Sequence, residues 1–130
     1  MNSTSFNNHL TYQVIGILYS VHNQLGSLHQ KKHYQRAIAQ VLRTENIPFE
    51  QEKPVDILFN SKKIGQYKLD FLINNQFILE TKTINTNLPR YHYQILSYMN
   101  QLQVRIGLLV NFRAQKLQIK RLLLPDHYLI

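Results

Sequence analysis

The chain has 130 residues, of which 44% are hydrophobic and 17% are charged, as expected of one folded domain and not of a disordered chain. It contains no cysteine, which excludes a disulfide framework and a thiolate zinc site. No apolar stretch approaches the roughly 18 residues of a membrane span, and the polar start is unlike a signal peptide. We therefore expect a cytoplasmic protein with no membrane partner.

The charge balance is strongly basic. The chain has 15 Lys and Arg residues against 7 Asp and Glu, which gives a formal net charge of +8. Phosphate groups attract such a surface and release counterions when they bind, so the composition favours nucleic acid as the partner. The alternative is a basic surface that only improves solubility.

Two helices are predicted in the first third of the chain. Apolar residues recur at spacings of three and four from Leu10 to Val21, and again from Tyr34 to Leu42. Gly26 is expected to end the first helix as its C′ residue. The predicted helices cover residues 9–24 and 29–44.

Extended segments and one more helix are predicted after Pro48. The predicted strands cover residues 49–59, 64–73, 77–83, 104–111 and 117–124. The third helix covers residues 89–102, and its cap is expected at Thr86 or Asn87. The order ααβββαββ predicts a single α/β domain over residues 1–130, with a core at about residues 9–124 and a mixed β-sheet flanked by helices.

Two carboxylates stand in apolar surroundings. Asp70 lies in YKLDFLI and Glu80 lies in FILETK, on strands expected to be neighbours. A buried carboxylate needs a partner, a metal ion or a raised pKa, because burial disfavours its charge. Two carboxylates that converge from adjacent strands suit a hard cation with oxygen ligands.

Lys82 extends this pattern. Strand side chains alternate, so Glu80 and Lys82 are expected on one face and Thr81 on the other. The backbone carbonyl of Thr81 then completes a metal shell made by Asp70 and Glu80, and Lys82 is placed to orient a water molecule or stabilise charge on a phosphate. The alternative is a structural Glu–Lys pair on a half-exposed strand.

An aspartate, nine further residues and then Glu-Thr-Lys form a pattern that resembles the PD-(D/E)XK, or restriction-endonuclease-like, superfamily. More narrowly, the chain resembles the small bacterial family named for its GxxExxY motif. The matching segments are LTYQVIGILYSVHNQLG (10–26), NIPFEQE (46–52), IGQYKLDFLI (64–73), FILETK (77–82), YQILSYMNQLQVRIGLLVNF (93–112) and LQIKRLLL (117–124).

The resemblance implies a restriction-endonuclease-like core and a metal-dependent nuclease. Asp70 and Glu80 would hold Mg²⁺ or Mn²⁺, and Lys82 would assist the attacking water. A polar residue on the third helix often completes such sites, which makes Gln94 a supporting catalytic candidate. A glutamine bonded only to the helix backbone is the alternative reading of Gln94.

The chain departs from the family pattern at Lys31, where the motif has a glutamate that commonly reaches the metal site. An ammonium facing the carboxylates would supply no ligand and would oppose a cation, by about 4 kcal/mol for a unit-charge contact at ~4 Å and an effective dielectric near 20. We expect instead that this flexible side chain turns to solvent. In either case the site has one carboxylate fewer than the family pattern.

The expected function is Mg²⁺-dependent hydrolysis of phosphodiester bonds, with DNA favoured over RNA. The alternative is a weakened or inactive nuclease fold that binds nucleic acid or a partner protein; a homodimer or a subunit of a larger complex is a third possibility. The candidate phosphate contacts are Lys31, Lys32, His33, Arg36, Arg90 and His92.

Overall fold

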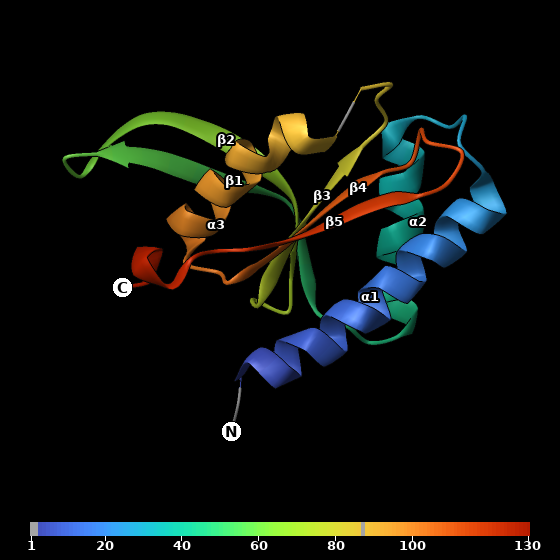
Figure 1. The fold of residues 1–130 in the computed structure, drawn as a ribbon, viewed down its shortest axis with the longest axis horizontal. Coiled ribbons are helices and arrows are strands. Elements are labelled where there is room, and N and C mark those ends of the chain that lie inside the picture. The colour runs from blue at the N-terminus through green and yellow to red at the C-terminus, as the bar shows by residue number, and fades with distance from the viewer. Residues whose placement is uncertain (1–2, 87) are drawn as a thin grey trace.

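The computed structural model describes the backbone of residues 3–86 and 88–130, and the side chains from residue 9 onward within these ranges. The first elements are α1 (Ser3–Leu25), α2 (Lys31–Thr44), β1 (Phe49–Phe59), β2 (Lys62–Ile73) and β3 (Phe77–Lys82). The others are η1 (Leu88–Tyr91), α3 (His92–Leu102), β4 (Ile106–Asn111), β5 (Gln118–Leu123) and η2 (Asp126–Tyr128). Figure 1 shows their arrangement.

The five strands form one mixed sheet in the order β1-β2-β3-β4-β5. Neighbouring strands are antiparallel except β3 and β4, which are parallel and joined by a connection that contains α3. Every residue of β4 is buried, as expected of a central strand covered on both faces. The predicted mixed sheet flanked by helices is therefore confirmed.

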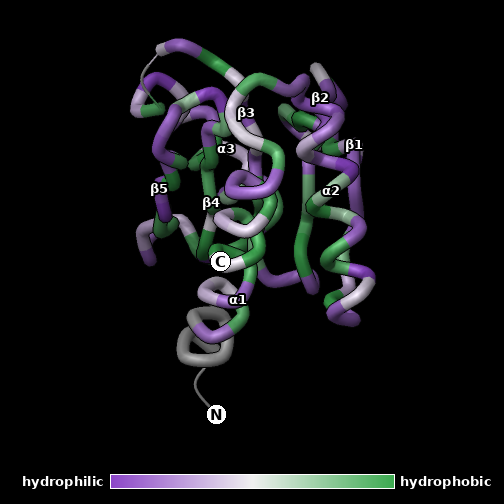
Figure 2. Tube along the Cα trace, turned by 90° about the vertical axis from the view of Figure 1, so that its right-hand side faces the viewer, coloured by the Kyte–Doolittle hydropathy of each residue, from purple (hydrophilic) through white to green (hydrophobic). Residues whose placement is uncertain are grey.

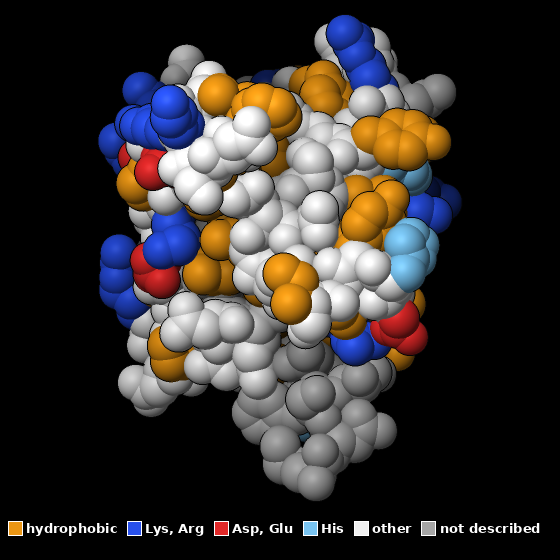
Figure 3. All heavy atoms as spheres, turned by 90° about the vertical axis from the view of Figure 1, so that its left-hand side faces the viewer, with side chains coloured by type: hydrophobic (Ala, Val, Ile, Leu, Met, Phe, Trp, Pro, Cys, Tyr) orange, Lys and Arg blue, Asp and Glu red, His pale blue; other side chains and the backbone are white. Residues whose placement is uncertain are grey.

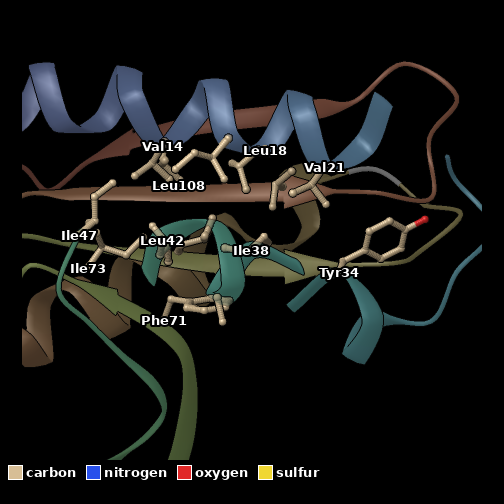
Figure 4. Close-up of a cluster of buried hydrophobic side chains, with 14 of the residues drawn as sticks. Val14, Leu18, Val21, Tyr34, Ile38, Leu42, Ile47, Phe71, Ile73 and Leu108 are labelled. Carbon is tan, nitrogen blue, oxygen red and sulfur yellow. The ribbon is translucent and has the colours of Figure 1, made fainter. Parts of the chain in front are cut away.

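Two hydrophobic clusters lie on the two faces of the sheet. Residues of α1 and α2 pack against Phe71, Ile73 and Leu108 on one face, where Figure 4 shows side chains from the helices and the strands pointing toward one another. Residues of α3 pack with Leu69 and Leu72 in the second cluster. Hydrophobic residues accordingly follow the central strands, and hydrophilic residues lie at the periphery (Figure 2).

Several residues at positive φ lie in the turns between elements. Gly26 has φ 77° and its N–H donates to the carbonyl of His22 at 2.8 Å, which ends α1 as predicted. Asn60 and Ser61 turn β1 into β2, both at positive φ. Asn74 and Asn75 adopt the same conformation between β2 and β3, in keeping with the tolerance of asparagine for this region.

Some predicted boundaries were wrong. The helix α1 begins at Ser3, six residues before the predicted start, because the prediction followed the apolar pattern that begins at Leu10. The predicted third helix is divided into η1 and α3, and the N-cap of α3 is Tyr91. The alternative cap, Asn87, lies outside the described residues. Among the described residues, no helix has the length and apolarity to cross a membrane.

Two glycines give opposite predictions for stability. A Cβ at Gly107 would lie 2.7 Å from Met99 Sδ and 3.1 Å from Ile95 Cγ2, so Gly107→Ala should destabilise the fold by about 1–3 kcal/mol through overpacking between β4 and α3. A Cβ at Gly16 would meet nothing within 4 Å, so Gly16→Ala should stabilise α1 by up to about 1 kcal/mol. Urea unfolding followed by circular dichroism measures both. Equal stability of Gly107→Ala and the natural chain would contradict this packing of α3.

Candidate functional site

The candidate site begins at an irregularity in β2. Pairing with β1 passes from Gln51–Phe71 to Lys53–Leu69 and omits Glu52 and Asp70. Glu52 has φ 52°, a conformation that is rare for a strand residue other than glycine. Side-chain alternation changes at the same point, because Leu69 joins the α3-side cluster while Phe71 joins the opposite one. Asp70 therefore lies at a break in the sheet.

Asp70 is 8% exposed and accepts several hydrogen bonds on one carboxylate oxygen. Its Oδ2 atom lies 2.8 Å from the Thr81 backbone nitrogen and 3.0 Å from Thr81 Oγ1, both of which donate to it. Thr81 Oγ1 in turn accepts a bond from Gln35 Nε2 at 3.4 Å. Thr81 faces α2 while Lys82 lies beside Tyr91, so the predicted alternation along β3 is confirmed. The bond from the Thr81 hydroxyl to Asp70 was not predicted.

Glu80 lies on β3 and bonds the backbone of Asp70. It is 4% exposed, and its Oε1 accepts the Asp70 backbone N–H at 2.8 Å. The β2–β3 ladder pairs Phe71 with Leu79, so beyond that pair the two carboxylates accept the N–H groups. Burial, and then the charge of Asp70, raise the pKa of Glu80 to about 7, although the Asp70 N–H, Lys31 and Lys82 act in the opposite direction.

Lys82 lies beside Tyr91, and two further tyrosines lie near Glu80. Its Nζ is 4.5 Å from the ring centroid of Tyr91, within the range of a cation–π contact. The rings of Tyr67 and Tyr98 stack at 3.7 Å. Burial, followed by the charges of Tyr98 and Glu80, raises the pKa of Tyr67. Burial and then the charge of Glu80 also raise the pKa of Tyr98, so both stacked tyrosines lie within electrostatic range of the site.

Lys31 also reaches this site, so the expectation that it turns to solvent was wrong. Its Nζ lies 3.2 Å from Asp70 Oδ2, and its side chain is 40% exposed. Lys31 is the first residue of α2, and the helix presents it on the same side as Gln35, one turn later. Asp70 is buried, so without this ion pair its charge would lose a compensating cation.

The other predicted phosphate contacts lie on α2, η1 and α3. Lys32, His33 and Arg36 are exposed on α2, and Arg90 is exposed with its guanidinium 5.9 Å from the Tyr91 ring. His92 differs, because its Nε2 is buried without a hydrogen-bond partner in the described structure.

Gln94 is exposed on α3, and its carbonyl accepts a bond from Ser97 Oγ. None of the described hydrogen bonds joins Gln94 to the carboxylates. Its catalytic role stays a prediction.

Two residues at the end of β4 were missed by sequence reasoning. Asn111 is 2% exposed and bonds both backbone groups of Ile84, just after β3. Arg113 donates to the carbonyls of Ser27 and His29, just before α2. The only available signal was a buried asparagine at the end of an apolar strand. Gln35, also missed, was marked by its polar type beside the apolar stripe of α2.

The donor set was compared with the needs of a hard cation. The hydrogen bonds described above use Asp70 Oδ2 and Glu80 Oε1, and none uses Asp70 Oδ1 or Glu80 Oε2. Carboxylate oxygens of this kind suit Mg²⁺ or Mn²⁺. The described residues contain no cluster of three Asp, Glu, His or Cys side chains, and the Lys31 ammonium is a competing cation. The site fits a divalent ion in chemical type, with two carboxylates.

The raised pKa of Glu80 predicts how stability depends on pH. Between its ordinary value of 4.5 and about 7, the unfolded chain releases this proton while the folded chain retains it, so stability falls as pH rises. Glu80→Gln in the presence of a chelator should match the natural chain below pH 4.5 and exceed its stability by about 3 kcal/mol above pH 7. Thermal or urea unfolding across this pH range measures the difference. Parallel profiles would show that Glu80 has the same pKa in the folded and the unfolded chain.

Comparison with known families agrees with this geometry. The family model of the PD-(D/E)XK nuclease superfamily matches residues 8–122. No curated protein and no solved structure matches the chain. The narrower GxxExxY resemblance stays a prediction. Because the match runs from within α1 into β5 and includes both buried carboxylates, the chain belongs to the PD-(D/E)XK nuclease superfamily.

Proposed function

We propose that the protein hydrolyses phosphodiester bonds in nucleic acid, preferentially DNA, with Mg²⁺ or Mn²⁺ at the Asp70–Glu80 site. The observation that carries the proposal is the convergence of these two buried carboxylates at the break between β2 and β3. Lys82 follows on β3, two residues after Glu80. Enclosed carboxylates beside an ammonium suit phosphoryl chemistry, because the charge developing on the phosphate needs cations nearby.

Each residue has a separate role in this proposal. Asp70 and Glu80 would hold the metal ion through the oxygens that accept no described hydrogen bond, together with the Thr81 carbonyl. The ion would supply Lewis acidity toward a phosphate oxygen and an activated water. Lys82 donates hydrogen bonds that orient the water or stabilise charge on the phosphate, and Gln94 supports the substrate from α3.

The surface around the site suits a polyanion. The helix α2 contains four Lys or Arg residues and no carboxylate. On other elements some basic residues lie beside acids, as in the pairs Lys63–Asp56 and Arg105–Asp126. Figure 3 shows one such face, where Lys and Arg at the edges accompany Asp and Glu. The proposed phosphate contacts are Lys31, Lys32, His33, Arg36, Arg90 and His92.

These contacts come from two segments. In Figure 1 the start of α2 and the segment that leads into α3 lie on either side of the C-terminal end of β3. A nucleic acid bound to both segments would cross the candidate site.

A second candidate function is nucleic-acid binding without cleavage. The ion pair between Lys31 and Asp70 favours it, because an ammonium 3.2 Å from the carboxylate opposes a divalent ion at the same group. A subunit whose missing carboxylate comes from another chain is compatible with the same observation.

The test is cleavage of single-stranded, duplex and branched DNA, and of RNA, with Mg²⁺, Mn²⁺ or EDTA. The natural chain should cut only with metal, and Asp70→Asn or Lys82→Ala should lower the rate by about 10²–10³-fold. Lys31→Glu should raise the rate, because it removes a competing cation and restores a carboxylate. Lys62 is exposed at the tip of the β1–β2 hairpin, so Lys62→Ala and Lys62→Glu are charge-matched controls that should leave the rate unchanged.

Two outcomes would contradict the proposal. Cleavage that persists in both Asp70→Asn and Lys82→Ala would show that another site or a contaminant cuts. Binding by the natural chain without cleavage, with Lys31→Glu equally inactive, would support the second candidate function instead.

A further inference from the structure

The Lys31 ammonium occupies a special position in this site. It lies 3.2 Å from Asp70 Oδ2, yet its side chain is 40% exposed. A lysine ammonium has three N–H donors, so one bond to Asp70 leaves two for a further ligand. The group thus touches a buried carboxylate on one side and is open to a ligand from solvent.

A second ammonium acts on the same carboxylates. The charges of Lys31 and Lys82 both favour the ionised form of Glu80, so both lie within electrostatic range of it. Lys31 approaches from α2, and Lys82 approaches from β3 beside Tyr91. The site therefore contains two cations attached to the chain opposite two carboxylates.

This charge balance changes what the site requires from solution. Two carboxylates without a cation would repel a phosphodiester, and a bound divalent ion usually offsets this repulsion. Here the Lys31 ammonium places a positive charge beside Asp70, and this charge belongs to the protein chain and not to an ion bound from solution. Ammonium groups bind phosphate oxygens through charge-assisted hydrogen bonds.

We propose that the Asp70–Glu80 site binds a phosphodiester of nucleic acid without a metal ion, with Lys31 providing the charge, and that Lys31 and a divalent cation compete for Asp70. The inference rests on the proposed function only in placing the phosphodiester at this site. It adds that substrate binding precedes and does not need the metal. Displacement of Lys31 from Asp70 is then the step that admits a cation.

The test measures the affinity of a fluorescein-labelled single-stranded DNA oligonucleotide by anisotropy, in EDTA and in Mg²⁺. The natural chain should bind in EDTA, and Mg²⁺ should change its affinity little. Lys31→Met should lose at least about tenfold in EDTA, where it lacks a hydrogen bond to a charged group, and should regain affinity with Mg²⁺.

Lys32→Met is the matched control, because it removes the same charge from the neighbouring exposed residue of α2. Its affinity for the oligonucleotide should fall by the same factor in EDTA and in Mg²⁺, as expected of an ordinary phosphate contact. Lys31→Arg retains the charge and should retain binding in EDTA. Equal behaviour of Lys31→Met and Lys32→Met, or a natural chain that binds only with Mg²⁺, would overturn the inference.

A measurement without DNA tests the competition directly. Mn²⁺ should raise the melting temperature of Lys31→Met more than that of the natural chain, and should have no such effect on Lys31→Met combined with Asp70→Asn. If Mn²⁺ raised the melting temperatures of the natural chain and Lys31→Met equally, the inferred competition between Lys31 and the cation would be wrong. The comparison also shows that each variant folds.

The two proposals fail separately. Intactness of the oligonucleotide is checked on a gel after each titration. Binding in EDTA with no cleavage under any metal condition would refute the proposed function and leave the inference standing. Cleavage with Mg²⁺ by a chain that does not bind DNA in EDTA would refute the inference and support the proposed function.

Discussion

Two carboxylates buried side by side set the constraint on which the rest of this site depends. Asp70 and Glu80 repel each other and lose hydration, so each must receive hydrogen bonds from the protein. Each accepts a backbone N–H from the opposite strand, since Thr81 N–H donates to Asp70 and Asp70 N–H donates to Glu80. These bonds take the place of the β2–β3 ladder, which ends at the pair Phe71–Leu79.

The same constraint explains the place of Lys31. A lysine in the first turn of a helix opposes the helix dipole, and α2 has no acidic residue there to compensate. Asp70, at 3.2 Å, supplies the missing negative charge from the sheet. One ion pair therefore relieves two unfavourable situations, an ammonium at a helix N-terminus and a carboxylate in the interior. Lys31 therefore balances part of the negative charge of the site. A glutamate at position 31, as in the family motif, would add negative charge and increase the need for a metal ion.

Much of the fold could be predicted because local signals determined it. The apolar periodicity of α1 and α2, the asparagine turns and Gly26 each specify their own conformation through a few neighbouring residues. Asp70 and Glu80 could also be singled out, since a carboxylate within an apolar strand requires a partner wherever that strand lies. These inferences needed only the sequence on either side of each residue.

The remaining features depend on residues far apart in the chain. The change of alternation at Asp70 involves the positive φ of Glu52 on the neighbouring strand, which no pattern within YKLDFLI contains. The direction of Lys31 depends on a carboxylate 39 positions later, because the side chain has no local preference that selects it. Only the folded chain, with Asp70 close to the start of α2, determines that Lys31 points to this carboxylate and not to solvent.

The end of β4 relates the two ammonium groups to each other. Asn111 holds Ile84, two residues after Lys82, and Arg113 holds the carbonyls that precede Lys31. The two segments that carry the lysines are thus both hydrogen-bonded to residues at the end of β4, although the lysines lie about fifty residues apart in sequence. Since the side chains of Asn111 and Arg113 bond the backbone of these segments, the end of β4 sets the spacing of the two backbone positions from which the lysines extend. A ligand that bridges both ammonium groups meets positions already set by β4, which reduces the ordering required on binding.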